Sequence, residues 1–336
     1  MDALIKPEVA NMFKTLRFLS TLMFAVMGAA AQVQAQAQPY PNKPVRVIVP
    51  AGPGDTCDLL MRLIGPKITE KTGQPWVVEN RPGSSGQLGL TLIKQAPADG
   101  YTLGCGQGGN MVIVPLSYQK VAYDTVKDFA PVSLVGSNFL ALVVNPDLPY
   151  KTTEELLNYA RANPGKVSFG TNGEGGFLHF ATELFRVQGG FTYLHVPYKS
   201  VSAVMTEILG GQINATLTSY LPAQPLISAG KVRLLGIATA KRLPDQPTVS
   251  TLSEALPGFA SGGWFGVIAP AGTPQAIINS LNRDINAALA LPEVVQKMKL
   301  YGLETHTESP EFFSDTIRRD FSKWGKLIGD IGFKPI

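Results

Sequence analysis

The sequence predicts an α/β protein of two lobes, each a mainly parallel sheet with flanking helices, joined by two crossing segments that act as a hinge. Short β-rich runs alternate with helical runs from Val45 onward, which favours βαβ units with helices on both faces of a sheet. Two extended apolar segments, 140–146 and 264–270, interrupt this alternation and divide it into two modules. Such an arrangement is typical of hinged binding proteins, in which a ligand lies between lobes at the carboxyl ends of strands.

The first module begins with a strand at 45–49, which is rich in β-branched residues and ends at the turn 50–54. Asp55 or Thr56 can cap the helix that follows, which we expect at 57–72. The pattern continues with a helix at 87–95 and with strands at 76–79, 101–105, 131–135 and 139–145.

The second module opens with a helix at 152–162, where Thr152 or Thr153 followed by Glu has the form of a capping box. Its further helices are expected at 176–189, 201–210 and 222–229, and its strands at 166–170, 192–196, 213–217 and 232–238. Helices at 274–290, 292–301 and 309–328 follow the second crossing. We expect this C-terminal part to return to the first module, so that lobe 1 comprises 38–140 and 265–336 and lobe 2 comprises 141–264.

The composition is that of a loop-rich globular protein, with 45% hydrophobic and 16% charged residues, 34 Gly and 26 Pro in a length of 336. This length is too great for one small core and suits two α/β lobes. The formal net charge of +4 is spread along the chain. The sequence lacks the basic run or aromatic-basic stripe that nucleic-acid binding requires, so we expect no nucleic-acid partner.

Residues 1–37 have the features of a cleavable signal peptide. Lys14 and Arg17 precede an apolar stretch at 18–31, and Ala35-Gln36-Ala37 matches the A-x-A cleavage pattern. The apolar stretch is shorter than the roughly 20 residues that a membrane-spanning helix needs. Translation from either Met1 or Met12 is compatible with this pattern. The sequence therefore predicts export and cleavage after residue 37.

Cys57 and Cys105 are the two cysteines of the sequence. In an exported protein such a pair suggests a disulfide, which is geometrically possible if the strands before them are neighbours. Two free thiols are the alternative. Neither C-x-x-C nor H-E-x-x-H spacing is present, and we expect no metal and no cofactor.

Several loops of small residues stand between the end of a predicted strand and the start of a helix, at 50–54, 104–110, 170–176 and 198–202. Such loops expose backbone N–H groups, and a helix N-terminus favours negative charge. One loop of this kind is usually only a turn. Several of them, distributed over two lobes, indicate a site for a small anionic ligand.

Catalytic interpretations find less support in the sequence. The loop 50–58 lacks both the Lys of a phosphate-binding loop and the third Gly of a dinucleotide-binding fingerprint. A nucleophile could be Cys57, at a helix N-terminus, or Ser84. The histidines available as a base are His179, His195 and His306. A secreted α/β hydrolase is therefore the alternative from another class, but no local signature links these residues, and capture without turnover is favoured.

Short motifs spaced over the whole mature chain form a specific series, although each motif is weak by itself. In order they are Tyr40-Pro41-Asn42-Lys43-Pro44-Val45, Val78-Glu79-Asn80-Arg81-Pro82-Gly83, Asp99-Gly100-Tyr101-Thr102-Leu103, Tyr123-Asp124, Lys127-Asp128-Phe129-Ala130-Pro131-Val132, His195-Val196-Pro197-Tyr198-Lys199, Leu209-Gly210-Gly211-Gln212, Ala229-Gly230-Lys231, Trp264-Phe265-Gly266 and Ala269-Pro270-Ala271-Gly272-Thr273-Pro274. Taken together, they resemble the solute-binding proteins of tripartite tricarboxylate transporters, the Bug family.

The resemblance implies a periplasmic, non-enzymatic protein with a type II-like Venus-flytrap fold, monomeric, that delivers a small organic carboxylate to membrane permease subunits. A ligand-sensing component for a membrane sensor is a further alternative. In the family, loop backbone amides, hydroxyl groups and ordered waters hold the carboxylate. The matching residues of the first lobe are Ala51, Gly52, Gly54, Asp55, Thr56, Cys57, Asp58, Gln107, Gly108, Gly109 and Asn110. Those of the second lobe are Gly173, Glu174, Gly175, Gly176, His179, Lys199, Ser200, Thr218, Ser219 and Tyr220.

The sequence departs from the usual family pattern inside these loops. Ala51 stands where a bulky residue is common, Asp55 where a second Gly is common, Cys57 in place of Ser or Thr, and Gly176 in place of a frequent hydroxyl residue. A negative Asp55 would oppose a carboxylate unless it turns outward to cap the helix. The smaller residues indicate a roomier pocket, for an aromatic, dicarboxylic, tricarboxylic or otherwise larger carboxylate.

Overall fold

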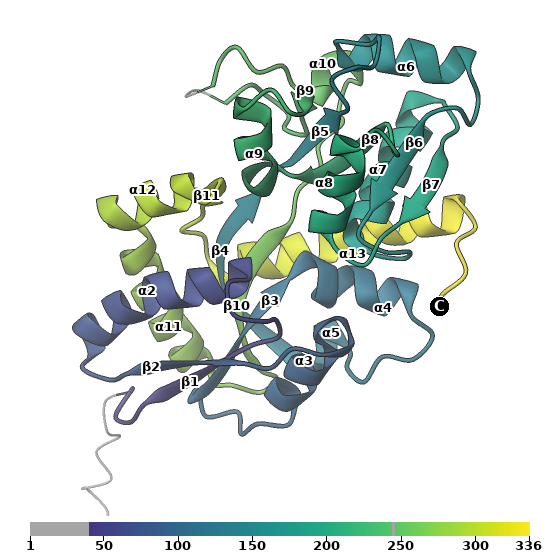
Figure 1. Ribbon diagram of the computed structural model, residues 1–336. Coiled ribbons are helices and arrows are strands. Elements are labelled where there is room, and N and C mark those ends of the chain that lie inside the picture. The colour runs from purple at the N-terminus through teal and green to yellow at the C-terminus, as the bar shows by residue number, and fades with distance from the viewer. Residues whose placement is uncertain (1–39, 244–245) are drawn as a thin grey trace, which may run out of the picture. The chain divides into compact units, whose positions relative to one another are not determined.

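A computed structural model describes residues 40–243 and 246–336 (Figure 1). Residues Lys43–Ile336 form one compact unit, and the fold below is that of this unit. The predicted signal peptide, 1–37, lies outside the described residues. Within 40–243 and 246–336, no helix combines the length and the apolarity that crossing a membrane requires.

The first sheet has six strands within the described part of the chain, in the order β11-β4-β10-β3-β1-β2. Their bounds are Val45–Val49 (β1), Trp76–Asn80 (β2), Thr102–Gln107 (β3), Phe129–Asn138 (β4), Trp264–Pro270 (β10) and Leu303–Thr305 (β11). β1 pairs in parallel with β2 and β3, whereas β10 runs antiparallel between β3 and β4. β11 pairs antiparallel with β4.

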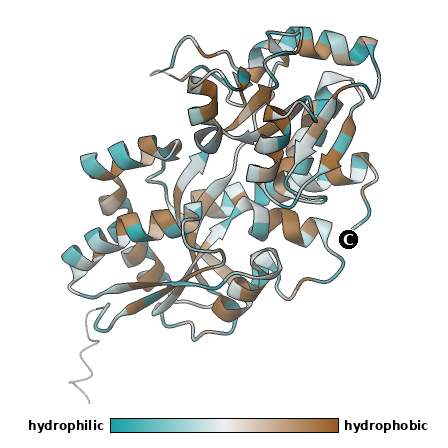
Figure 2. Ribbon diagram, viewed as in Figure 1, coloured by the Kyte–Doolittle hydropathy of each residue, from teal (hydrophilic) through white to brown (hydrophobic). Residues whose placement is uncertain are grey.

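The centre of this sheet is covered on both faces. Val47 and Ile48 are neighbours in β1, so their side chains point to opposite faces, and both are at 0% exposure. Figure 2 shows hydrophobic residues concentrated on the strands, while helices such as α12 carry many hydrophilic ones. Burial on both faces explains why β1 reads as a continuous apolar run instead of an alternating one.

The second sheet has five strands among the described residues, in the order β7-β6-β8-β5-β9. Their bounds are Leu140–Val144 (β5), Ser168–Thr171 (β6), Leu194–Pro197 (β7), Ala215–Ser219 (β8) and Arg233–Ile237 (β9). β6 pairs in parallel with β7 and β8, and β5 runs antiparallel between β8 and β9. Phe169 of β6 is fully buried beside the rings of Phe185, Phe191 and Tyr193, which form the aromatic core of this part.

The helices that flank the sheets connect most of the strands (Figure 1). Their bounds are Thr56–Thr72 (α2), Gln87–Lys94 (α3), Val114–Ser117 (α4), Thr125–Asp128 (α5), Thr153–Ala162 (α6), Phe177–Gly189 (α7), Val201–Leu209 (α8), Tyr220–Ser228 (α9), Leu252–Ala255 (α10), Gln275–Leu289 (α11), Pro292–Leu300 (α12) and Pro310–Asp330 (α13), with the short turns Ser84–Gly86 (η1) and Gly109–Ile113 (η2). The long helix α13 packs against β4, α4 and α7. It therefore contacts elements of both modules.

Two segments carry the chain between the sheets, and they lie side by side. β4 ends at Asn138 in the first sheet, and β5 begins at Leu140 in the second. The returning segment bonds to them: Asn138 N donates to Gly263 O at 2.9 Å, and Leu140 N donates to Ser261 O at 3.3 Å. Gly263 N also donates to Asn138 Oδ1 at 2.6 Å. The crossing is thus a short hydrogen-bonded pair of strands.

The predicted two-lobe α/β fold is confirmed, but both sheets are mixed, so the expectation of mainly parallel sheets is wrong. The crossing strands account for most of the antiparallel pairs. β5 and β10 each enter a sheet from the side that faces the other sheet, which is where the parallel strands end. Leu140 therefore pairs with Ser219 and Phe265 with Gln107, so both strands run against their neighbours. The sequence pattern does not predict η2, α4, α5, α10 or β11, because segments of three to five residues show no measurable periodicity.

Candidate functional site

A cavity of about 500 Å³, called the hinge cavity below, lies beside the crossing segments, where strands of both sheets end. Its lining includes Pro50 after β1, Gln107 at the end of β3 and Asn138 at the end of β4. From the second sheet it includes Asn172 after β6 and Ser219 at the end of β8. Ligands of α/β proteins bind at such carboxyl ends, and the volume falls within the roughly 300–1,000 Å³ of small-molecule sites.

Two helices, α3 with 8 residues and α7 with 13, begin at this cavity without a side-chain cap. Gly176 precedes α7 and Gly86 precedes α3, and neither first turn has a capping side chain among the described residues. Both glycines line the cavity, together with Phe177 and Leu178 of the first turn of α7. The first N–H groups of a helix have no partner within the helix, and they carry the positive end of its dipole. At α3 these groups are taken up by the preceding turn, because Gln87 N donates to Ser84 O and Leu88 N donates to Gly83 O. The bare backbone donors suited to an anion are therefore those at the start of α7.

Asn110 adds a side-chain donor to this wall. It is 3% exposed, and its Oδ1 accepts a hydrogen bond from Gln107 N at 3.1 Å. Its Nδ2 is buried and has no hydrogen-bond partner within the described residues. An unpaired buried donor costs about 1–3 kcal/mol, so a group that accepts from it would bind favourably. Nδ2 lies beside Gly86, because a Cβ on that residue would be 2.8 Å from it.

Asp55 is the one lining side chain of the described cavity that carries a formal charge at neutral pH. Its Oδ1 accepts from Cys57 N at 2.9 Å, so it caps α2 as the sequence allowed. It nevertheless faces the cavity, and the described residues show no ion pair to it. Burial raises the pKa of Asp55 above its usual range, and the hydrogen bond from Cys57 opposes this shift.

Several backbone N–H groups of the loop 50–58 donate to acceptors within the loop itself. Gly54 N donates to Asp58 Oδ2 at 2.9 Å, Asp55 N donates to Gly52 O at 3.2 Å, and Cys57 N is held by Asp55. The carboxylates of Asp55 and Asp58 therefore offset the positive end of the α2 dipole and occupy the N–H groups of Cys57 and Gly54. On the side of the first sheet, the free donor is Nδ2 of Asn110 instead.

A disulfide between Cys57 and Cys105 fixes this region, with a Cα–Cα distance of 6.0 Å. Of the two alternatives that the sequence left open, the structure contains the bridge. Both cysteines are at 0% exposure, and neither lines the cavity. The bridge joins the first turn of α2 to β3, and so holds the loop 50–56 beside Gln107. Cys57 is thereby removed as a nucleophile.

Two histidines hold the loop before α7 in place. Their rings stack with centroids 4.1 Å apart, and His179 Nδ1 accepts from Gly175 N at 3.0 Å. His195 Nε2 contacts Thr171 Oγ1 at 2.7 Å, and that hydroxyl donates to Gly173 O at 3.1 Å. Burial lowers the pKa of His179 to about 4, and the neighbouring His195 lowers it as well. His179 is therefore neutral at pH 7 and acts as a structural acceptor.

Residues 333–336 also support this loop. A Cβ on Gly175 would lie 3.2 Å from Phe333 Cζ and 3.3 Å from Ile336 Cδ1, so both side chains pack against the loop. Ile336 N donates to Ser117 O at 2.9 Å, which ties the same segment to the end of α4. The glycine loop of α7 is thus held from behind by packing and hydrogen bonds outside the cavity.

The rest of the wall is largely apolar and aromatic. Phe265, Trp264, Tyr118 and Val201 line it, in addition to the first turn of α7. Trp264 Nε1 donates to Asp320 Oδ2 at 2.7 Å, so the indole is fixed and presents carbon atoms to the cavity. The cavity therefore combines polar donors for a charged group with apolar surface for a carbon skeleton.

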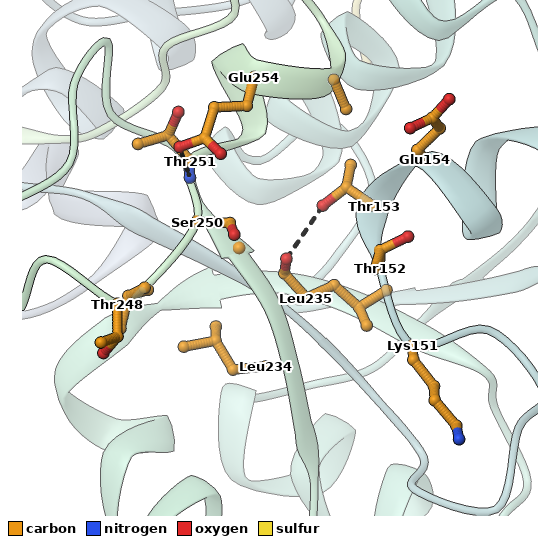
Figure 3. A pocket seen from close by; sticks show the side chains of 13 residues that line it. Lys151, Thr152, Thr153, Glu154, Leu234, Leu235, Thr248, Ser250, Thr251 and Glu254 are labelled. Carbon is orange, nitrogen blue, oxygen red and sulfur yellow. Dashed lines mark hydrogen bonds between the residues drawn. The ribbon is translucent and has the colours of Figure 1, made fainter.

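A second cavity, of about 390 Å³, lies around the starts of α6 and α10 (Figure 3). Several of its polar groups are paired with one another. Thr152 caps α6 by accepting from Glu155 N, Thr251 and Glu254 form a capping box on α10, and Figure 3 shows Thr153 directed to the carbonyl of Leu235.

The structure brings together part of the residue set expected from the sequence. The predicted residues that line the hinge cavity are Asp55, Thr56, Gln107, Gly108, Gly109, Asn110, Gly175, Gly176 and Ser219. Those that lie outside its lining are Ala51, Gly52, Gly54, Cys57, Asp58, Gly173, Glu174, His179, Lys199, Ser200, Thr218 and Tyr220. Most of this second group shapes the loops: Ser200 caps α8, and Tyr220 donates to Gln246 Oε1 at 2.8 Å.

Several lining residues were not named from the sequence. They include Ser85, Tyr118, Asn138, Asn172 and Trp264. Asn172 stands inside a predicted loop and Trp264 inside a family motif, so position alone could have indicated both. Asn138 ends a strand at the crossing, where a side chain faces both sheets. Tyr118 follows α4, a helix too short to be predicted.

A two-sheet fold with a ligand-sized cavity at its crossing defines a solute-binding protein of the periplasmic type. The chain matches the model of the tripartite tricarboxylate transporter family receptor, TctC, over residues 60–333. It is 36% identical to the UPF0065 protein in the tcbD-tcbE intergenic region of Pseudomonas sp. strain P51, over 96% of each chain. It is 33% identical to Protein BugT of Bordetella pertussis, over 96% of this chain and 99% of that one. The chain belongs to the tripartite tricarboxylate transporter receptor family.

Solved structures agree with this assignment. The structure of R. palustris Rpa4515 with adipate has a TM-score of 0.78 and 33% identity, covering 88% of this chain and 100% of that one. MatC (Rpa3494) from Rhodopseudomonas palustris with bound malate has a TM-score of 0.72 and 28% identity, covering 86% and 100%. The predicted family and the expectation of a receptor that is not an enzyme are confirmed, and the hydrolase alternative is not supported.

Proposed function

We propose that this chain is an exported receptor that captures a small organic carboxylate in the hinge cavity and delivers it to the permease subunits of a tripartite tricarboxylate transporter. One observation carries the proposal. The cavity has the uncapped start of α7 and an unpaired Asn110 Nδ2, and no Lys or Arg among its described lining residues. Neutral, pre-oriented donors of this kind suit a carboxylate.

The ligand contacts that we propose are the predicted residues that line the cavity. They are Asp55, Thr56, Gln107, Gly108, Gly109, Asn110, Gly175, Gly176 and Ser219, with Asn138 and Asn172 added. The adipate and malate of the two similar structures support a carboxylate as the ligand class. The apolar wall at Trp264 and Phe265 supports a ligand with a carbon skeleton of some size.

We further propose that residues 38–140 with 265–336 form one lobe and residues 141–264 the other. Closure would bend the paired crossing segments at Asn138 and Gly263, which also line the cavity. The signal peptide at 1–37 would direct the chain to the periplasm, where it would act as a monomer. Small-angle scattering with and without ligand tests the closure, since a receptor that closes becomes more compact when the ligand binds.

Binding itself is tested by calorimetry and thermal unfolding on protein stripped of ligand by unfolding and refolding. A panel of aliphatic and aromatic mono-, di- and tricarboxylates is offered. A ligand at 100 times its Kd should raise the free energy of unfolding by about 2.7 kcal/mol. If no carboxylate in the panel binds or shifts the unfolding transition, the proposed function is wrong.

A pair of variants localises the binding to the cavity. Asn110→Asp keeps an acceptor for Gln107 N and replaces the unpaired donor by an oxygen that repels a carboxylate. We expect at least about a tenfold loss of affinity, as for a lost hydrogen bond to a charged group. Asn279→Asp adds the same charge on the exposed face of α11 and should leave affinity unchanged. Equal affinities of the two variants would place the ligand elsewhere.

A further inference from the structure

The hinge cavity has an uneven charge distribution that a simple anion site would not need. Its donors are the start of α7 and the amide of Asn110, both of which favour negative charge. Asp55 lines the same cavity and brings a negative charge of its own. The described residues show no cation paired with it. A ligand that fits this cavity must therefore meet both signs.

The carboxylate of Asp55 has acceptor capacity left. An ionised carboxylate offers about four lone-pair sites, and the described residues give it one hydrogen bond, from Cys57 N at 2.9 Å to Oδ1. Burial, and to a lesser extent the neighbouring Asp58, raises the pKa of Asp55, because a partly buried carboxylate loses contact with water. A donor from the ligand would remove this cost, whereas a second ligand carboxylate would increase it.

We propose that Asp55 makes this receptor selective for carboxylates that also carry a hydrogen-bond donor, an ammonium or a hydroxyl group, over those whose second polar group is another carboxylate. This inference rests on the proposed function, because it assumes that the carboxylate binds at the bare donors. In the proposed complex, Oδ1 of Asp55 caps α2, and its Oδ2 accepts a hydrogen bond from the donor group of the ligand. The selectivity comes from attraction to the donor and repulsion of the competing anion together.

The test uses two series of probes that share a skeleton within each series. The six-carbon series is hexanoate, adipate, 6-hydroxyhexanoate and 6-aminohexanoate. The four-carbon series is succinate, malate and aspartate. Kd is measured by calorimetry for the wild type, Asp55→Asn and Asp124→Asn. Asn is as good an N-cap as Asp, so Asp55→Asn keeps the start of α2 and removes the charge.

Asp124→Asn is the matched control, because Asp124 also caps a helix by accepting from Val126 N and Lys127 N, but it lies outside the cavity lining. In at least one series the wild type should bind the donor-bearing probes about tenfold or more tighter than the dicarboxylate without a donor, adipate or succinate, a difference expected for a hydrogen bond to a charged group. Asp55→Asn should lose most of that preference and bind adipate or succinate more tightly. Asp124→Asn should keep the wild-type preference.

The outcomes separate this inference from the function on which it rests. If carboxylates bind but the wild type shows no preference in either series, or Asp55→Asn keeps it, the selectivity assigned to Asp55 is wrong and the carboxylate receptor stands. If the wild type binds no carboxylate at all, the proposed function fails and this inference fails with it. Unfolding curves of Asp55→Asn that match those of the wild type establish that its binding data come from folded protein.

Discussion

Loss of the disulfide between Cys57 and Cys105 should remove a large part of the conformational stability of this receptor. The bridge joins residues 48 positions apart in the sequence. Restricting the unfolded chain over such a span is worth about 4 kcal/mol in the chain-entropy model. Folded domains have a total free energy of unfolding of only about 5–15 kcal/mol. The bridge is therefore expected to decide how far the protein resists denaturants.

The measurement compares urea unfolding of three samples: oxidised wild type, reduced wild type and the double variant Cys57→Ala/Cys105→Ala. The reduced wild type keeps the sulfur atoms, so it isolates the cross-link from the packing. Ala is preferred to Ser in the variant because both positions are at 0% exposure, and a buried hydroxyl would need a partner. The reduced protein should lose about 4 kcal/mol, and the variant slightly more because its side chains are smaller.

Two results would refute this reasoning. Equal unfolding midpoints for the oxidised and reduced wild type would show that the cross-link does not restrict the unfolded chain as assumed. Rapid reduction by dithiothreitol without denaturant would show that the bridge is accessible in the folded protein, against its complete burial. Slow reduction that accelerates with urea is the expected behaviour.

Other substitutions test single contacts. His179 has a pKa of about 4 in the folded protein, below its ordinary 6.5, so the unfolded chain takes up a proton first and the free energy of unfolding falls as pH drops from 6.5 to 4. The loss is up to about 3 kcal/mol. His179→Gln should reduce the difference between the free energies of unfolding measured with urea at pH 5 and at pH 7.5. A pH dependence identical to that of the wild type would contradict this prediction. Gly86→Ala should cost about 1–3 kcal/mol in thermal unfolding, since φ is +89° and the new Cβ would be 2.8 Å from a side-chain nitrogen. Gly109→Ala is the control, because a Cβ at that position would have no heavy atom within 4 Å, and it should leave the thermal transition unchanged. Equal losses of stability for the two variants would show that backbone strain and the close contact at Gly86 are not the cause. Asn138→Ala leaves Gly263 N without its side-chain acceptor at 2.6 Å and should cost about 1–3 kcal/mol in calorimetry; an unchanged transition would show that this bond does not stabilise the crossing.

The alternation of strands and helices predicted the fold because each strand is either buried on both faces or bounded by a clear turn. The strand at 45–49 and the helices at 176–189 and 274–290 agree with β1, α7 and α11 to within one or two residues. The direction of β5 and β10 could not be predicted from periodicity. It depends on which side of each sheet the crossing enters, and that is set by the pairing of Leu140 with Ser219 and of Phe265 with Gln107.

The candidate site was predictable as a set of loops but not as a set of contacts. Whether a loop N–H faces a ligand depends on which acceptors the loop itself supplies. Asp55 and Asp58 accept from the N–H groups of Cys57 and Gly54, whereas the start of α7 has no such side chain. The sequence shows an Asp in one loop and glycines in another, but it does not show where the carboxylate turns. The lining role of Asn138 required knowledge of the crossing.

The support of Gly175 by Phe333 and Ile336 has a consequence for how relatives are compared. These two side chains lie more than 150 positions along the chain from the loop that they hold. A change at 333 or 336 would tilt the first turn of α7 and alter ligand affinity, while every cavity residue stayed the same. Two receptors with identical linings can therefore differ in what they retain, and grouping such proteins by lining residues alone would assign some of them to the wrong nutrient.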